Sequence, residues 1–374
     1  MISVVIPTYR EAETIEPTLR RAAAALEKAG EAFELLVVDD ASGDGTAERA
    51  ESLQKELPVR VLRRRGKRGL ATAVVDGWAI ARGEVLGVMD GDLQHPPEVL
   101  TQLAETLRQT EADLVVASRY CSDGGSNRWP WWRRIGSAAA THLAATVLPL
   151  RLADLTDPMS GMFLVRARAL EGVKLEPLGF RTLLEVVGKG KIASSREVSY
   201  VFERREQGRS KLGARQCAEY LLHLGRLARS TGQVRDWARY ALVGLAGAGV
   251  DLAVLVGLVA AHWPVALAAA VAIQLAILSN FFGNRWWTFS RHASGQLGRK
   301  LVCYEKVCAP GAGLNWLLTL VLLHAGWPLV GAAGAGIVAD GAVNLSLNIP
   351  SIWRIWGPRS ASKRENHGSS LTAA

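Results

Sequence analysis

The 374-residue sequence lacks two common phosphate-binding loops. No Gly-x-Gly-x-x-Gly follows its first apolar run, and no Gly-Lys-Ser/Thr loop is present. Because these loops supply the backbone N–H groups that hold a diphosphate, their absence argues against dinucleotide-dependent oxidoreductases and P-loop nucleotidases. Cysteine is also scarce: the four cysteines show no paired framework and no metal-ligand spacing, so we expect free thiols.

Charge is absent from two long stretches of the second half. Residues 252–284 and 307–339 contain no Asp, Glu, Lys or Arg, and each stretch has 33 residues. A membrane-spanning helix needs about 20 residues, and a buried soluble helix would need a polar face that these stretches lack. A Trp-Pro turn divides each stretch, at Trp263-Pro264 and Trp327-Pro328. We therefore expect four spans, at roughly 238–260, 265–284, 301–324 and 329–353.

Basic residues flank these spans on one side only. They precede the first span, fill the connection between the second and third, and follow the fourth, whereas the two outer turns hold no Lys or Arg. The positive-inside rule then predicts a multi-pass protein of the cell membrane with residues 1–235 in the cytoplasm. The absence of a cleavable signal peptide before Met1-Ile2-Ser3-Val4 fits a cytoplasmic amino terminus.

The membrane half repeats itself at an offset of 64 residues. Gly247-Ala248-Gly249 recurs as Gly311-Ala312-Gly313, and the Trp-Pro turns and paired asparagines recur at the same offset. Each copy holds two spans, so both share one orientation, and we expect a parallel repeat about an axis along the membrane normal. Asp251 and Asp340 are expected near mid-membrane, where either a functional role or a satisfied structural hydrogen bond would account for them.

Apolar runs alternate with helical patterns through the first 120 residues. The runs are typical of buried parallel strands: Ile2–Pro7, Leu35–Asp39, Val59–Leu62, Val85–Met89 and Leu114–Ala117. Helices are expected between them, at Glu11–Ala29, Thr46–Leu57, Leu70–Ala81 and Pro97–Gln109. This alternation predicts an α/β domain with a mostly parallel sheet, whose ligands bind beyond the carboxyl ends of the strands.

Two carboxylates end the fourth apolar run. Asp90 and Asp92 stand one residue apart, so strand periodicity turns both side chains to the same side. With Gln94 they offer hard oxygen ligands that suit Mg²⁺ or Mn²⁺ carrying a diphosphate. Asp39 ends an earlier run and is placed to accept hydrogen bonds from a base or ribose, while Ser42 or Asp44 would cap the next helix.

These residues belong to motifs that resemble glycosyltransferase family 2. The motifs are Val5-Ile6-Pro7-Thr8-Tyr9-x-Glu11, Val37-Val38-Asp39-Asp40-x-Ser42-x-Asp44-Gly45-Thr46 and Asp90-x-Asp92-x-Gln94-His95-Pro96-Pro97. Three more narrow the resemblance to dolichol-phosphate mannose synthases and their bacterial polyprenyl-phosphate relatives: Ser118-Arg119-Tyr120, Asp157-Pro158-x-Ser160-Gly161 and Phe202-x-x-Arg205-x-x-Gly208-x-Ser210-Lys211-Leu212. The membrane half is similar to the GtrA-like four-helix family through Asn280-Phe281-x-x-Asn284-Arg285-x-Trp287-x-Phe289.

The resemblance implies a domain plan. Residues 1–215 would form a GT-A type nucleotide-sugar-binding domain, 216–236 an interfacial helix or linker, 237–357 a four-helix transmembrane domain of two repeated hairpins, and 358–374 a disordered tail. Two stretches that are too short or too polar to span the membrane, 133–152 and 217–231, are expected to be helices at the membrane surface.

The resemblance also implies an activity, the inverting transfer of mannose from GDP-mannose to dolichyl or polyprenyl phosphate at the cytoplasmic membrane face. A phosphate monoester is ionised near neutral pH, since its second pKa is about 6, so no general base is needed. Asp157 would be either an alternative base or a structural turn residue.

The resemblance also implies the site residues. The expected nucleoside contacts are Pro7, Tyr9, Glu11, Val37 and Asp39. The expected metal and diphosphate contacts are Asp90, Gly91, Asp92 and Gln94, with Asp90, Asp92 and Gln94 as ligands of Mg²⁺ or Mn²⁺. The two phosphate-bearing reactants would meet at Arg119, Arg133, Arg205, Ser210 and Lys211, and the expected catalytic residues are Asp90, Asp92, Arg119, Arg205 and Lys211.

Two residues depart from the pattern of the synthases. Gly91 replaces a usual Ala, and Arg204 stands where an acidic residue is common, which leaves donor or acceptor preference open. A UDP-glucose-dependent polyprenyl-phosphate glucosyltransferase is therefore an alternative. A transferase tethered to a lipid-linked sugar flippase is another, supported by Asp251 and Asp340. A processive polysaccharide synthase is disfavoured, because no Gln-x-x-Arg-Trp follows the carboxylates. No nucleic-acid partner is expected, and the oligomeric state stays open.

Overall fold

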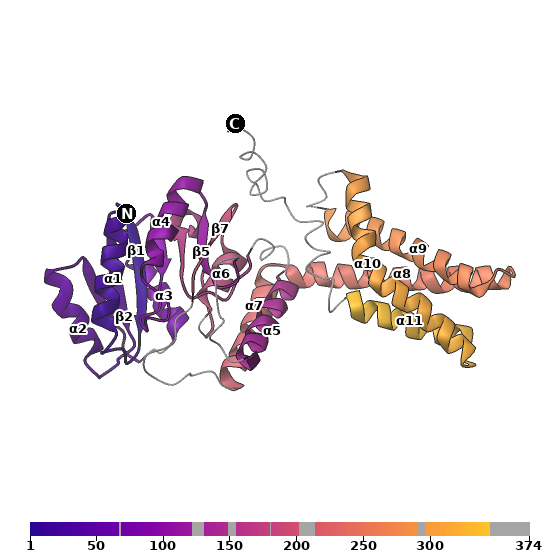
Figure 1. Ribbon diagram of the computed structural model, residues 1–374, viewed down its shortest axis with the longest axis horizontal. Coiled ribbons are helices and arrows are strands. Elements are labelled where there is room, and N and C mark those ends of the chain that lie inside the picture. The colour runs from indigo at the N-terminus through magenta and orange to yellow at the C-terminus, as the bar shows by residue number, and fades with distance from the viewer. Residues whose placement is uncertain are drawn as a thin grey trace, which may run out of the picture. The chain divides into compact units, whose positions relative to one another are not determined.

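The computed structural model describes residues 1–66, 69–121, 131–148, 155–179, 181–201, 214–290 and 296–344, without the side chains of 131–135 and 214–216. The described residues form two compact units (Figure 1). The first, a mixed α/β unit, contains residues 1–144 and 154–231. The second is helical and, among the described residues, contains 145–148, 232–290 and 296–344.

The first unit is built on a sheet that has seven strands within the described residues, in the order β3-β2-β1-β4-β6-β5-β7. The strands are β1 (Ile2–Thr8), β2 (Phe33–Asp39), β3 (Val59–Arg63), β4 (Val85–Val88), β5 (Leu114–Ser118), β6 (Phe163–Arg166) and β7 (Ser195–Ser199). Strand β6 runs antiparallel to β4 and β5, and the other pairs are parallel. The mostly parallel sheet and its first five strands are confirmed, whereas β6 and β7 were not predicted.

Helices cover both faces of this sheet. They are α1 (Ile15–Lys28), α2 (Thr46–Ser52) with η1 (Leu53–Lys55), α3 (Leu70–Ala79) and α4 (Val99–Thr110). On one face, Val4 of β1 shares a buried core with Leu19 of α1 and Leu103 of α4. On the other, a Cβ on Gly77 of α3 would lie 2.7 Å from Val5 Cγ1, so α3 rests directly on β1. Because successive side chains of β1 point to opposite faces of the sheet, this strand packs against helices on both sides.

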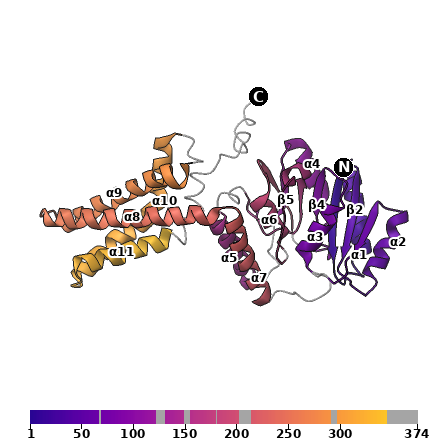
Figure 2. The same cartoon turned by 180° about the vertical axis from the view of Figure 1, so that it is seen from behind.

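Three more helices contribute to the first unit: α5 (Trp131–Val147) as far as Ala144, α6 (Thr182–Lys189) and α7 (Ala214–Ser230), with a short η2 (Ala167–Leu170) after β6. Helices α5 and α7 correspond to the two segments predicted at the membrane surface, and they lie side by side in both views (Figure 2). Tyr220 Oη of α7 donates a hydrogen bond to the Ala140 carbonyl of α5 at 2.6 Å. Their position at a membrane stays a prediction.

The helical unit contains α8 (Gln233–Ala260), α9 (Val265–Gly283), the π-helical η3 (Asn284–Thr288), α10 (Leu297–His324) and α11 (Leu329–Val343). Three of the helices in the described residues are long and apolar enough to cross a membrane, namely α8, α9 continued by η3, and α10. The fourth expected span begins with the apolar α11, and its residues 345–353 lie outside the described residues, as does the expected tail 358–374.

Equivalent positions of the repeated hairpins meet inside this unit. Asn315 Nδ2 donates a hydrogen bond to Asp251 Oδ2 at 3.0 Å, and these two residues are separated by the repeat offset of 64. A Cβ on Gly247 would overlap the carboxamide of Asn280, just as one on Gly311 would lie 3.2 Å from that of Asn344.

Both membrane carboxylates accept a hydrogen bond from an asparagine. Asp251 accepts from Asn315, and Asp340 Oδ1 accepts from Asn344 Nδ2 at 2.8 Å. An ionisable group inside a membrane is costly unless it is hydrogen-bonded, so these asparagine partners fit a structural role of the two carboxylates.

Candidate active site

The carboxyl ends of β1, β2 and β4 form one edge of the sheet. Strand β1 lies between the other two, and Thr8 at its end pairs in register with Asp39. Beyond the end of β4, the chain carries Asp90, Gly91 and Asp92 past the end of β1. The Gly91 carbonyl accepts hydrogen bonds from Thr14 Oγ1 at 2.8 Å and Thr18 Oγ1 at 3.3 Å, which ties this turn to α1.

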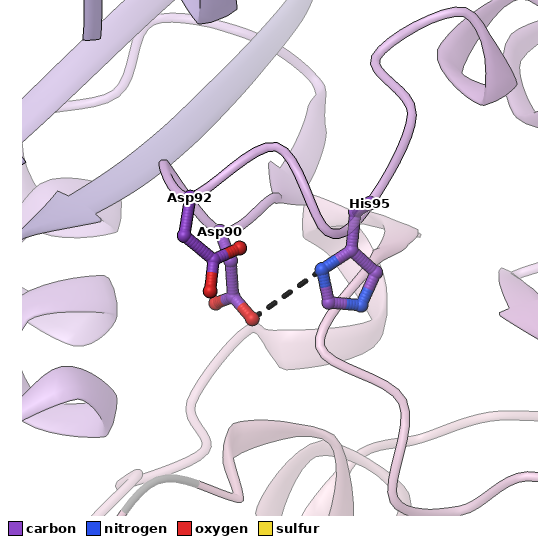
Figure 3. A group of neighbouring side chains, drawn as sticks. All are labelled: Asp90, Asp92 and His95. Atoms are coloured by element: carbon purple, nitrogen blue, oxygen red, sulfur yellow. Dashed lines mark ion pairs between the residues drawn. The ribbon is translucent and has the colours of Figure 1, made fainter. Parts of the chain in front are cut away.

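Asp90, Asp92 and His95 form a compact group of potential metal ligands (Figure 3). One ligand atom from each lies within 4.8 Å of the others. His95 Nδ1 is 3.4 Å from Asp90 Oδ2, and burial lowers the pKa of His95 to about 4, so the imidazole is neutral at neutral pH. Two carboxylates and a neutral imidazole suit a divalent cation. Gln94, the third ligand expected from the sequence, donates its backbone N–H to Asp92 Oδ1 at 3.1 Å, and its role as a ligand stays a prediction.

Gly161 closes over this group from the loop before β6. A Cβ at this position would lie 2.9 Å from Asp90 Oδ2 and 3.2 Å from His95 Cε1. The other face of His95 is set by Tyr200, whose ring stacks on the imidazole at 5.6 Å between centroids and 25° between planes. Gly161 therefore limits the space around Asp90 and His95, and Tyr200 packs against the imidazole of His95.

Arg119 and Asp157 form a buried, bidentate ion pair next to this group. Arg119 Nε donates to Asp157 Oδ2 and Nη2 to Oδ1, both at 2.7 Å, and the side chains are 7% and 0% exposed. Burial opposes the charge of Arg119, but its hydrogen bonds to Asp157 raise the pKa of the guanidinium above its ordinary value. The loop is fixed further by Glu197 Oε1, which accepts the backbone N–H of Thr156 at 2.8 Å and of Asp157 at 3.0 Å. Asp157 thus serves as the ionic partner of Arg119.

Asp39 is buried beneath the turn that follows β2. Its carboxylate accepts hydrogen bonds from the Ser42 backbone N–H at 3.0 Å, from Ser42 Oγ, and from Thr8 Oγ1 at 3.3 Å. Asp44 Oδ1 accepts the backbone N–H of Thr46 at 3.1 Å, at the start of α2. The N-cap of α2 is Gly45, so the expectation that Ser42 or Asp44 caps this helix is wrong: Asp44 lies one residue before the cap, and Ser42 organises Asp39.

The other nucleoside contacts expected from the sequence lie at the same edge. Pro7 and Val37 stand in the adjacent strands β1 and β2, one residue out of register with each other. Tyr9 and Glu11 follow β1, and the Glu11 backbone N–H donates to Thr46 Oγ1 at 3.0 Å. The structure therefore brings these four residues and Asp39 to the edge that also holds Asp90 and Asp92.

Arg181 joins the site although no local pattern marks it. It precedes α6, donates a hydrogen bond from Nη1 to the Met159 carbonyl, and interacts electrostatically with Asp90, Asp157 and Arg119. Burial lowers its pKa to about 10, which still leaves a cation at neutral pH. Four of the expected residues cannot be placed: Arg205, Ser210 and Lys211 lie outside the described residues, as does the side chain of Arg133.

Two family models match the chain. Glycosyl transferase family 2 matches residues 3–173, and the GtrA/DPMS transmembrane domain matches residues 239–348. A dolichol-phosphate mannosyltransferase from Pyrococcus furiosus is 37% identical over 352 residues, which cover 94% of this chain and 99% of the relative. A dolichol-phosphate mannosyltransferase from Saccharomyces cerevisiae is 34% identical (60% and 86% covered), and a polyprenol monophosphomannose synthase from Mycolicibacterium smegmatis is 33% identical (62% and 91% covered).

The chain combines a carboxylate site at the edge of a mostly parallel sheet with apolar helices of membrane-spanning length. This combination defines a membrane-bound nucleotide-sugar transferase. With these matches the chain belongs to glycosyl transferase family 2, with a GtrA/DPMS transmembrane domain, and within it to the polyprenyl-phosphate mannosyltransferases. The resemblance drawn from the sequence motifs is confirmed, as is the expectation of a membrane enzyme.

Proposed function

We propose that the protein transfers mannose from GDP-mannose to a dolichyl or polyprenyl phosphate, with inversion, at the cytoplasmic face of a membrane that it crosses several times. The observation that carries the proposal is the group of Asp90, Asp92 and His95 beside Asp39 at one sheet edge. The names of the relatives support mannose as the sugar, and the one-sided basic segments support the orientation.

Asp39 is the proposed anchor of the nucleoside. A carboxylate offers about four lone-pair sites, and the hydrogen bonds from Ser42 and Thr8 occupy three of them. The remaining capacity suits a ribose hydroxyl or a base N–H. Pro7, Tyr9, Glu11 and Val37 would complete the nucleoside pocket, since they lie at the same edge of the sheet as Asp39.

Asp90, Asp92 and His95 fit a divalent ion, with Gln94 as a further proposed ligand. When bound there, Mg²⁺ or Mn²⁺ would neutralise the negative charge that develops on the leaving nucleoside diphosphate. The chain's own contribution is to hold the carboxylates in position: Thr14 and Thr18 fix the Gly91 carbonyl, while Gly161 and Tyr200 confine Asp90 and His95.

The acceptor phosphate needs positive charge rather than a base, because it is already ionised at neutral pH. The charge of Arg119 is balanced by Asp157. Arg181 lies close enough to Asp90 and Arg119 to interact with both electrostatically. We therefore assign Arg181 to the acceptor phosphate. Arg119 and the sequence-predicted Arg133, Arg205, Ser210 and Lys211 would bind the phosphates of the two reactants.

Sugar transfer by the purified protein in detergent tests the proposal. Polyprenyl phosphate is offered with Mg²⁺ or Mn²⁺ and a labelled donor, either GDP-mannose or UDP-glucose, and Asp92→Ala is the control. Metal-dependent product from GDP-mannose that the variant does not form supports the proposal. Product from UDP-glucose alone would overturn the choice of donor, and no transfer by a protein that still binds nucleotide would overturn the proposed reaction.

A further inference from the structure

A cleft lies between α6 and α7 of the first unit, and none of its lining residues belongs to the carboxylate site. It has a volume of about 440 Å³. Most of its lining side chains are ionisable: Glu176, Glu185, Lys189, His223, Arg226 and Arg229. None of these residues has a role in the proposed sugar transfer, so the charged side chains of the cleft are not explained by that reaction.

The inner wall of the cleft is a buried and internally balanced cluster. Glu185 Oε1 lies 2.6 Å from Lys189 Nζ, and Glu185 Oε2 lies 3.0 Å from His223 Nε2. Burial raises the pKa of Glu185, but its hydrogen bonds with His223 and Lys189 outweigh that effect and lower the pKa to about 2. At the rim, Glu176 pairs with Lys174. Each carboxylate of the cleft therefore already has a cationic partner at neutral pH.

Two further cations of the cleft are not balanced in this way. Arg226 and Arg229 are exposed and stand three residues apart on α7, so both project from the same side of the helix. Among the residues that the structure describes, no carboxylate lies within ion-pair distance of either guanidinium. The cleft thus has two excess positive charges at its mouth, in groups whose planar shape suits a phosphate.

The same helix carries apolar side chains into solvent. Leu221 is 55% exposed and Leu222 is 64% exposed, just before the two arginines. Arg229 stands four residues before α8, a helix of membrane-spanning length and hydropathy. Because a chain extends at most about 3.6 Å per residue, Arg229 lies within about 14 Å of the start of that helix. Exposed leucines and free arginines this close to a membrane span match the headgroup layer of a bilayer.

We propose that this cleft binds the phosphodiester headgroup of an anionic membrane phospholipid through Arg226 and Arg229, with Leu221 and Leu222 in contact with the acyl region. The lipid is a component of the surrounding bilayer and not the substrate, since the cleft is separate from the carboxylate site. The inference rests on the membrane location of the enzyme and is independent of its donor sugar.

The test measures lipid retention by the full-length protein. Protein is purified in detergent, equilibrated with equal amounts of phosphatidylglycerol and phosphatidylcholine, and examined by native mass spectrometry. Arg226→Gln/Arg229→Gln is compared with wild type and with a matched control, Arg49→Gln/Lys55→Gln, which removes two cations from α2 and η1. A polybasic contact contributes about a factor of five in affinity per charge at an anionic surface, so the cleft variant should lose about thirtyfold of the preference for phosphatidylglycerol.

Two results would overturn the proposal. One is an unchanged preference for phosphatidylglycerol in the cleft variant. The other is displacement of the bound lipid by millimolar inorganic phosphate or glycerol 3-phosphate, which would identify the cleft as a site for a soluble anion. A preference lost in the cleft variant, kept in the control and insensitive to the soluble anions supports a lipid site. Because the readout is binding, it stands whichever sugar donor the enzyme uses.

Discussion

Gly161 offers a test of the carboxylate site that changes no charged or polar group. In Gly161→Ala, the new Cβ would lie 2.9 Å from Asp90 Oδ2, whereas ordinary van der Waals contacts begin near 3.4 Å. The carboxylate must therefore move by about 0.5 Å. Because it is the end of a flexible side chain, the fold should tolerate the move, but the ligand geometry should not. Displacing a reacting group by about 1 Å costs about a hundredfold in rate, so we expect about a tenfold loss here.

Gly91→Ala is the matched control on the other side of the same carboxylates. A Cβ at position 91 would lie 3.3 Å from Thr8 Cγ2 and 3.4 Å from Ile6 Cγ2, so the neighbouring methyl groups need to move by only about 0.1 Å. Alanine at this position is also the residue usual in related synthases, and we expect nearly unchanged activity.

The assay is the rate of mannosyl transfer against Mn²⁺ or Mg²⁺ concentration at saturating donor. Gly161→Ala should raise the metal concentration for half-maximal rate by about tenfold, the lower end of the effect of disturbing a contact to a metal ligand. Thermal unfolding of both variants verifies that the fold is intact. Equal metal dependence in Gly161→Ala and Gly91→Ala would refute the argument that Gly161 positions Asp90.

Three further outcomes are expected. Asp157→Asn leaves the buried Arg119 without its ionic partner and should lower stability by about 3–5 kcal/mol, measured by thermal unfolding, with a loss under about 1 kcal/mol contradicting the buried pair. Arg181→Gln should raise the KM for polyprenyl phosphate more than tenfold while nucleotide affinity, measured by calorimetry, stays near wild type; an unchanged KM would remove Arg181 from the proposed phosphate contacts. Glu185 has a folded-state pKa of about 2 against an ordinary 4.5, so its stabilisation, about 3 kcal/mol at most, is complete above pH 4.5 and is lost as the pH falls towards 2. Acid unfolding curves of Glu185→Gln should lack this loss, whereas the exposed-site control Glu16→Gln should keep it.

The parallel part of the sheet could be predicted because its strands are buried on both faces. Val4 and Val5 alternate between the α1–α4 layer and α3, so β1 is apolar apart from Ser3 and Thr8. Strand β7 could not be found in this way, because its sequence Ser195–Ser199 has only Val198 as an apolar residue and its side chains are only partly buried. Strand β6 is short and antiparallel, and the βαβ pattern contains no signal for it.

The candidate site was predictable where it follows strand ends. Asp39, Asp90 and Asp92 each stand at the carboxyl end of a strand, so topology alone brings them together. The neighbours of these residues come from distant loops: Gly161 lies against Asp90, and Arg181 donates a hydrogen bond to the Met159 carbonyl, through tertiary packing that no local spacing encodes. The pairing of Arg119 with Asp157 likewise depends on side-chain geometry between two loops.

The contact between Asp251 and Asn315 has a consequence for how the membrane unit came to exist as one chain. These residues are equivalent across the repeat, so two identical hairpins assembled about the same axis would place two aspartates or two asparagines face to face. Two aspartates would repel each other, and two asparagines would place no carboxylate there. A tandem chain, in which the halves are free to diverge, can set a carboxylate against an amide at this contact. Asp340 shows the same divergence, because its equivalent in the first hairpin is the buried Ala276. The two hairpins keep equivalent glycine–asparagine contacts, while the polar groups inside the bundle distinguish one half from the other.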